Sequence, residues 1–293
     1  MVMLPPMTTL LSLTLVLGLA AITASGQDID AALGGSFKGP LGLQLYSLRD
    51  SFNKDVPGTL DQTKNFGFVN VELAGTYGQT PEQFHELLAA RGLKAIAGHF
   101  PYERFKNDPE GIATEAKILG MQYAGCAWIP HNGAFDEKTC REAAAVFNHA
   151  GEVLASHGIK FYSHTHGYEF QPFADGTLFD LLMHETNPRY VSFEMDVMWV
   201  VFPGQDPVKL LYKYGPRWKL MHLKDPRKGI ESNLSGGTDQ NNDVVLGTGQ
   251  TDWPAVLKAA RKVGVQWYFI EDESKSVLDQ MPKHLNYLEH VSW

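Results

Sequence analysis

The chain is poor in cysteine, with only Cys126 and Cys140 among its 293 residues. A single pair is not a disulfide framework, although two thiols could pair in an oxidising compartment. Cys126 lies in the apolar run Tyr123-Ala124-Gly125-Cys126-Ala127-Trp128, which is typical of a buried small side chain. The fold is therefore not expected to depend on disulfides.

The chain also lacks an excess of positive charge, because its net charge is −8 at pH 7. Proteins that bind nucleic acid need a basic face, so this balance argues against nucleic acid as a partner. It fits a protein that acts on a small neutral ligand.

Charge is missing altogether from the N-terminus, where the first charged side chain is Asp28. The apolar run Leu10–Ile22 is short for a membrane span, and Ala24-Ser25-Gly26 supplies small residues for cleavage. We predict a signal peptide over residues 1–26 and a flexible stretch over 27–39. The mature protein would be periplasmic or secreted, with no stable membrane insertion after cleavage.

Beyond residue 39, short apolar runs alternate with amphipathic segments, and no Pro/Ser-rich linker interrupts them. We expect helices such as Pro81–Arg91 and Trp253–Val263, and a long polar loop over Pro226–Gly249 that is functional or mobile. The pattern predicts one (β/α)8 barrel over residues 40–293. A doubly wound sheet is the alternative, but no G-x-G-x-x-G follows the first strand. The expected strands are Leu41–Leu45, Val69–Leu73, Lys94–Ala97, Tyr123–Trp128, Lys160–Ser163, Val191–Met195, Lys219–Leu223 and Trp267–Ile270.

Catalytic residues of such barrels lie at the carboxyl ends of the strands. Here the last four strand ends present Glu169, Asp196, His222 and Glu271. Because these strands are neighbours, the four side chains can converge on one point. Three carboxylates and one imidazole suit one hard or borderline divalent cation. Mn²⁺ is the expected ion, with Mg²⁺, Co²⁺ or Zn²⁺ as alternatives.

Four motifs at these strand ends resemble the xylose isomerase-like sugar (phosphate) isomerase/epimerase superfamily, which includes ketose 3-epimerases. The resemblance covers essentially the whole mature chain. The motifs, in chain order, are His164-Thr165-His166 with Glu169-Phe170, Asp196 with Trp199, His222-Leu223-Lys224-Asp225, and Leu246-Gly247-Thr248-Gly249-Gln250-Thr251-Asp252-Trp253.

The resemblance implies that Glu169, Asp196, His222 and Glu271 are the metal ligands, and that Glu169 and Glu271 are also the acid/base pair. The chain departs from the ketose epimerases at Trp199, where those enzymes have a histidine that touches substrate. Further substrate-binding candidates line the strand ends. Structural roles stay open for several of them. Lys224 could form an ion pair with Asp225 or Asp196, and His164 could be a strand residue that is hydrogen-bonded inside the barrel. These candidates are His164, His166, Trp199, Lys224, His99, Tyr46 and Trp128.

The expected function is a metal-dependent isomerase or epimerase. It would remove the proton next to the carbonyl of an unphosphorylated sugar and form an enediolate. The same site could serve a 3-keto-glycoside lyase or hydratase. Two other classes stay open: a phosphodiesterase like endonuclease IV, and a non-catalytic sugar-binding barrel. A small carbohydrate is the expected partner, and a homo-oligomer is an open alternative.

Overall fold

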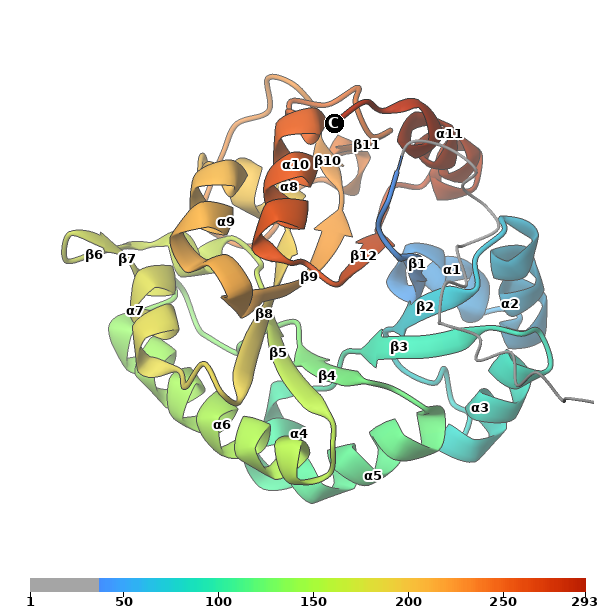
Figure 1. Ribbon diagram of the computed structural model, residues 1–293, viewed down its shortest axis with the longest axis horizontal. Helices are drawn as coiled ribbons and strands as arrows, with labels where there is room; N and C mark the ends of the chain where they lie inside the picture. The colour runs from blue at the N-terminus through green and yellow to red at the C-terminus, as the bar shows by residue number, and fades with distance from the viewer. Residues whose placement is uncertain (1–36) are drawn as a thin grey trace, which may run out of the picture.

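The computed structural model describes residues 37–293, and eight parallel strands in this range form a barrel surrounded by helices (Figure 1). The strand order around the barrel is β3-β2-β1-β12-β9-β8-β5-β4. The predicted single (β/α)8 barrel is therefore confirmed for the described part of the chain. The barrel strands are β1 (Leu41–Gln44), β2 (Asn70–Leu73), β3 (Lys94–Gly98), β4 (Tyr123–Cys126), β5 (Lys160–His164), β8 (Val191–Asp196), β9 (Trp218–Leu223) and β12 (Trp267–Ile270).

The barrel closes between β3 and β4 through a short stretch of backbone hydrogen bonds. The amide of Gln122 donates to the carbonyl of Ile96 over 2.9 Å, and the amide of Phe100 donates to the carbonyl of Gly125 over 2.8 Å. A parallel bridge also joins His99 to Gly125. All eight strands therefore deliver their carboxyl ends to the same face.

The helices form the outer layer of the barrel (Figure 1), and their ends follow local sequence signals. Thr80 forms a capping box with Gln83, and Gly92 and Gly158 take positive φ angles just after helices. The helices are α1 (Arg49–Phe52), α2 (Val56–Asn65), α3 (Pro81–Ala89), α4 (Tyr102–Asn107), α5 (Pro109–Leu119), α6 (Glu137–Ser156), α7 (Leu178–Glu185), α8 (Val197–Val201), α9 (Pro207–Tyr214), α10 (Trp253–Val263) and α11 (Val277–His290).

Two small hairpins stand on the carboxyl side of the barrel strands. One pairs β6 (Pro172–Phe173) with β7 (Gly176–Thr177). The other pairs β10 (Asp225–Pro226) with β11 (Asp243–Val244). The amide of Gln250 also donates to the carbonyl of Pro226 over 3.0 Å, which joins the two ends of the predicted 226–249 loop. The loop therefore leaves from and returns to the strand end that carries His222.

The predicted signal peptide and residues 27–36 lie outside the described residues. Phe37 is buried and packs edge-on against Tyr268, with ring centroids 5.3 Å apart. Within residues 37–293, no helix is long and apolar enough to cross a membrane. Cys126 and Cys140 are both buried and free, in keeping with a fold that does not depend on disulfides.

Candidate metal centre and catalytic site

Asp196 ends β8 and also caps helix α8. Its Oδ1 accepts the amide of Trp199 over 3.1 Å, and its own amide donates to Thr165 Oγ1 over 3.0 Å. These two bonds fix the direction of the carboxylate. The other oxygen, Oδ2, is fully buried and has no hydrogen-bond partner. Buried carboxylate oxygens rarely stay unpaired, so Oδ2 marks a position where a ligand belongs.

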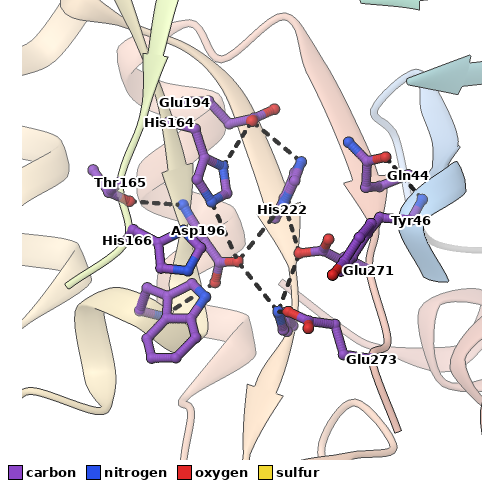
Figure 2. A network of polar contacts seen from close by, with 12 residues as sticks. Gln44, Tyr46, His164, Thr165, His166, Glu194, Asp196, His222, Glu271 and Glu273 are labelled. Atoms are coloured by element: carbon purple, nitrogen blue, oxygen red, sulfur yellow. Dashed lines mark hydrogen bonds and ion pairs between the residues drawn. The ribbon is translucent and has the colours of Figure 1, made fainter. Parts of the chain in front are cut away.

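His222 and Glu271 meet Asp196 at this position (Figure 2). His222 Nδ1 lies 3.1 Å from Glu271 Oε2 and 3.7 Å from Asp196 Oδ2. The three ligand atoms all lie within 4.8 Å of one another and could hold a metal ion. We call Asp196, His222 and Glu271 the upper group. The structure therefore brings together three of the four ligands predicted from the sequence.

A fourth side chain approaches the upper group from β5, and it is His164. Its Nδ1 lies 2.9 Å from Glu194 Oε2, and its Nε2 lies 4.0 Å from Asp196 Oδ2. His222 has the same arrangement, because its Nε2 lies 2.5 Å from Glu72 Oε2 while Nδ1 faces Asp196. A carboxylate behind each imidazole leaves the forward nitrogen free to ligate, as is usual for metal-bound histidines.

Glu169, the remaining predicted ligand, belongs to neither candidate metal group of the described residues. Both of its carboxylate oxygens lie 3.1 Å from the amide of His166. The side chain thus folds back onto the turn that follows β5, where Gly167 takes φ +91°. Burial raises the pKa of Glu169 to about 7, although the backbone amides act in the opposite direction. The predicted acid/base role of Glu169 stays a prediction.

A second group lies deeper in the barrel and also could hold a metal ion: His99, His164, Glu194 and His222. Glu194 Oε2 is its centre, at 3.3 Å from His99 Nε2, 2.9 Å from His164 Nδ1 and 3.2 Å from His222 Nε2. Because these imidazoles already satisfy Glu194 Oε2, the group can stand as a polar layer without an ion. Glu194 is therefore a polar residue of the barrel core that three imidazoles contact.

Lys224 is a buried cation beside the upper group. Its Nζ lies 3.1 Å from Glu271 Oε2 and 3.9 Å from Asp196 Oδ2, and it also bonds Glu273. Burial opposes the charge, but Asp243, Glu271 and Glu273 raise the pKa of Lys224 well above its ordinary value. Burial likewise opposes ionisation of Glu271, but Lys224 and His222 hold its pKa well below the usual range. The site thus pairs an ammonium with an ionised carboxylate.

The predicted substrate-binding residues occupy two levels of the barrel mouth. His166 stacks on Trp199 with ring centroids 4.8 Å apart, and Lys224 lies 5.6 Å from the Trp199 ring centroid. Tyr46 and Trp128 stand at the rim, 43% and 41% exposed. His164 and His99 lie lower, in the polar layer around Glu194. A ring-shaped ligand above the upper group would meet His166, Trp199 and Lys224 first.

The 226–249 loop is held at its base by Asp225. The Asp225 carboxylate accepts the amides of Gly247, Gly249 and Thr251 over 2.9–3.2 Å, and the indole N–H of Trp253 over 2.9 Å. The aspartate of the H-x-K-D motif thus organises the Gly-rich motif in which the loop ends.

Further along this loop, Gly236 lies against the aromatic rim. A Cβ at this position would stand 2.7 Å from Tyr168 Cδ1 and 3.0 Å from Trp128 Cζ3. The tip of the loop therefore reaches the β4 and β5 side of the site.

Two carboxylates beside Lys224 escaped the sequence analysis as site residues: Asp243 and Glu273. Glu72 orients His222 from β2, whereas Glu273 and Asp243 surround Lys224. Glu273 follows Glu271 by two residues, which is a readable signal. Asp243 comes from the long loop, and no periodicity or motif marks it.

The upper group fits a divalent cation. His164 stands outside that group and approaches it at Asp196, with Nε2 4.0 Å from Asp196 Oδ2. Metal–ligand bonds of about 2.0–2.2 Å place neighbouring ligand atoms roughly 3–3.5 Å apart, near the 3.1–4.0 Å separations seen here. The unpartnered Asp196 Oδ2 lies at the centre of these contacts. With His164 as a fourth ligand, two imidazoles and two carboxylates would form a borderline donor set, suited to Zn²⁺, Co²⁺ or Mn²⁺.

The chain belongs to the xylose isomerase-like TIM barrel family, whose family model matches residues 60–293. It is similar to inosose dehydratase 1 of Bacillus cereus (strain ZK / E33L), with 26% identity over 282 residues, which cover 90% of this chain and 92% of the relative. The inosose dehydratase of Clostridium botulinum (strain Alaska E43 / Type E3) is 30% identical over 256 residues, 77% and 82% of the two chains. A sugar phosphate isomerase/epimerase structure from Parabacteroides distasonis ATCC 8503 shares the fold, with TM-score 0.72, 24% identity and 89% and 97% coverage.

Proposed function

We propose that the protein is a divalent-metal-dependent lyase that removes water from an unphosphorylated cyclic keto-polyol, such as an inosose or a 3-keto-glycoside. The observation that carries this proposal is the buried Lys224 ammonium 3.1 Å from the ionised Glu271 carboxylate. Curated relatives named inosose dehydratases support the same reaction class. Isomerisation or epimerisation, expected first from the sequence, begins with the same proton removal and is the second candidate.

Elimination needs a base for the C–H proton and an acid for the departing hydroxyl. Glu271 accepts the proton from the carbon beside the carbonyl. A carbon–oxygen bond on the next carbon then breaks, and the hydroxyl takes a proton from Lys224 and leaves as water. Because Glu271 and Lys224 are in contact, the captured proton can pass back to Lys224. This return restores both groups, so the net change is loss of one water.

A divalent cation held by Asp196, His222, Glu271 and His164 would supply positive charge to the carbonyl oxygen and so lower the pKa of the adjacent C–H. Asp196 is fixed by its cap to Trp199, and the two imidazoles are fixed by Glu72 and Glu194. Preorganised ligands of this kind need little rearrangement during the reaction. Mn²⁺ remains the ion we propose to test first, followed by Zn²⁺ and Co²⁺.

Export also remains a proposal, resting on residues 1–26 of the sequence alone. Sugar phosphates are scarce outside the cytoplasm, and this is why we propose an unphosphorylated substrate. A purified protein that turns over phosphorylated sugars only would contradict that part of the proposal.

The reaction is tested by proton NMR in D₂O with the Mn²⁺-loaded protein and a panel of inososes, 3-keto-glucosides and ketoses. We expect loss of the signal beside the carbonyl together with a dehydrated product. Glu271→Gln should lower the rate of both events by about 10²–10⁴-fold, the usual contribution of a positioned base. Lys224→Gln should lower the rate of water elimination more than the rate of proton exchange beside the carbonyl, because this variant keeps Glu271 as the base but loses the acid.

Glu152→Gln, on the exposed face of α6, is the matched control and should leave both rates unchanged. Epimerised or isomerised product without dehydration would replace the lyase proposal with the second candidate. Absence of both exchange and product across the panel, with metal bound, would contradict an enzymatic proton removal on these rings.

A further inference from the structure

Several side chains near the Lys224 ammonium carry a buried polar atom that has no hydrogen-bond partner. Among residues 37–293 these atoms include Asp196 Oδ2, Asp243 Oδ1, His166 Nδ1 and Trp199 Nε1. An unpaired buried polar atom costs about 1–3 kcal/mol, so folded proteins keep few of them. The proposed cation accounts for Asp196 Oδ2 but not for the atoms of Asp243, His166 and Trp199.

The side chains that carry these atoms lie close to one ammonium. Lys224 Nζ is 3.8 Å from Asp243 Oδ2, 3.9 Å from Asp196 Oδ2 and 5.6 Å from the Trp199 ring centroid. Since His166 stacks on Trp199, its free nitrogen belongs to the same neighbourhood. A polyhydroxylated ring presents donors and acceptors around its whole edge, so one such ligand can satisfy donor and acceptor atoms together.

Asp243 differs from the others because it comes from the long loop, whereas Asp196 ends β8, and His166 and Trp199 follow β5 and β8 within three residues. Its Oδ2 accepts the amide of Glu273 over 2.7 Å, and its side chain is 3% exposed. That single bond anchors the loop to the end of β12. A structural role needs only Oδ2 and leaves the buried Oδ1 unexplained.

We propose that Asp243 is a substrate-binding residue, brought to the site by the 226–249 loop, whose Oδ1 hydrogen-bonds one hydroxyl of the ring while Lys224 holds a neighbouring oxygen. The identity of the ring rests on the proposed function. The loop is then part of the recognition surface, and its Asp243 selects for a hydroxyl at one ring position.

A ligand-by-variant cycle tests this role. Binding of an inosose, each of its monodeoxy analogues and myo-inositol to the Mn²⁺-loaded wild type is measured by isothermal titration calorimetry, alongside Asp243→Ala. For the wild type, removal of one particular hydroxyl should weaken binding about tenfold, as expected for one lost hydrogen bond. For Asp243→Ala that same analogue should bind as well as the parent ring, while the other analogues keep their wild-type penalties.

Loss of the bond to the Glu273 amide would weaken all ligands alike, so only the analogue-specific change reports the contact. Asp239→Ala is the matched control, because Asp239 is an exposed loop residue bonded within its own turn. Asp239→Ala should show the same loss of affinity for each monodeoxy analogue as the wild type. A uniform effect of Asp243→Ala on all rings overturns the inference, and so does failure of the wild type to bind any ring. Binding with the expected cycle but without turnover supports the inference and contradicts the proposed reaction alone.

Discussion

At the scale of single residues, the two histidines of this site are oriented by neighbouring carboxylates. Glu72 and Glu194 each hold one nitrogen of an imidazole, so that the other nitrogen of His222 and of His164 faces Asp196. The carboxylates thereby set which nitrogen can ligate. His164 is the last residue of β5 and Tyr162 stands two residues before it, so strand alternation puts both inside the barrel. Glu169 follows the turn at Gly167, beyond the end of β5, so strand alternation does not predict the direction of its side chain.

Glu169 should make stability depend on pH. Burial raises its pKa from 4.5 to about 7, so the folded protein holds a proton that the unfolded chain releases. This contribution is complete below pH 4.5 and is lost as the pH rises through 7, by about 3 kcal/mol in total. Glu169→Gln removes the titration. In urea unfolding of the metal-free protein, the unfolding free energy of Glu169→Gln should rise relative to that of the wild type as the pH increases from 4.5 to 8. A difference in unfolding free energy that does not vary with pH would contradict this.

At the scale of elements, the long loop is tied to the barrel at three places. Asp225 organises its carboxyl end, Asp243 bonds the end of β12, and Gly236 lies against Trp128 and Tyr168. Such a loop is ordered mainly by contacts with other elements. The sequence of the loop is polar and rich in Gly and Asn, which indicates that it forms neither a long helix nor a barrel strand. The same sequence does not predict which elements the loop contacts.

The contact at Gly236 can be separated from backbone strain by two matched substitutions. Gly236 and Gly133 have φ angles of +74° and +75°, but a Cβ at Gly133 would meet nothing within 4 Å. Gly236→Ala and Gly133→Ala therefore carry a similar backbone cost of about 1 kcal/mol, and neither changes the residues beside Lys228. Only Gly236→Ala should also displace the loop from Trp128 and Tyr168, so that trypsin cleaves faster after Lys228 in limited digestion. Equal cleavage rates in the two variants would show that the contact does not hold the loop.

At the scale of the whole molecule, the site joins four neighbouring strands, because His164, Asp196, His222 and Glu271 come from β5, β8, β9 and the end of β12. Repulsion among the carboxylates of the upper group is offset in part by Lys224. A cation that binds this arrangement stabilises the closed barrel, since the unfolded chain does not assemble the ligands.

Removal of the metal should therefore lower thermal stability. At a cation concentration about 100 times Kd the stabilisation is roughly 2.7 kcal/mol, or about 5–10 °C in Tm for a chain of this size. EDTA should lower the midpoint of calorimetric unfolding by that amount, and excess Mn²⁺ should restore it. His164→Gln should weaken metal binding whereas Glu169→Gln should not. The reverse result would support the ligand set with Glu169 that the family resemblance implies.

The sequence by itself determined the barrel and most of the centre. Its eight apolar runs alternating with helical segments, with no G-x-G-x-x-G after the first strand, favour a barrel over a doubly wound sheet. Parallel strands bring their carboxyl ends to one face, so the sequence places Asp196, His222 and Glu271 together. Only the tertiary structure shows how Glu169 and His164 lie relative to these three side chains. The turn at Gly167 folds Glu169 back onto backbone amides, while Glu194, on a neighbouring strand, orients His164 toward Asp196. It also decided that Asp243 reaches Lys224, because the path of a long loop follows from contacts distant in sequence and not from local pattern.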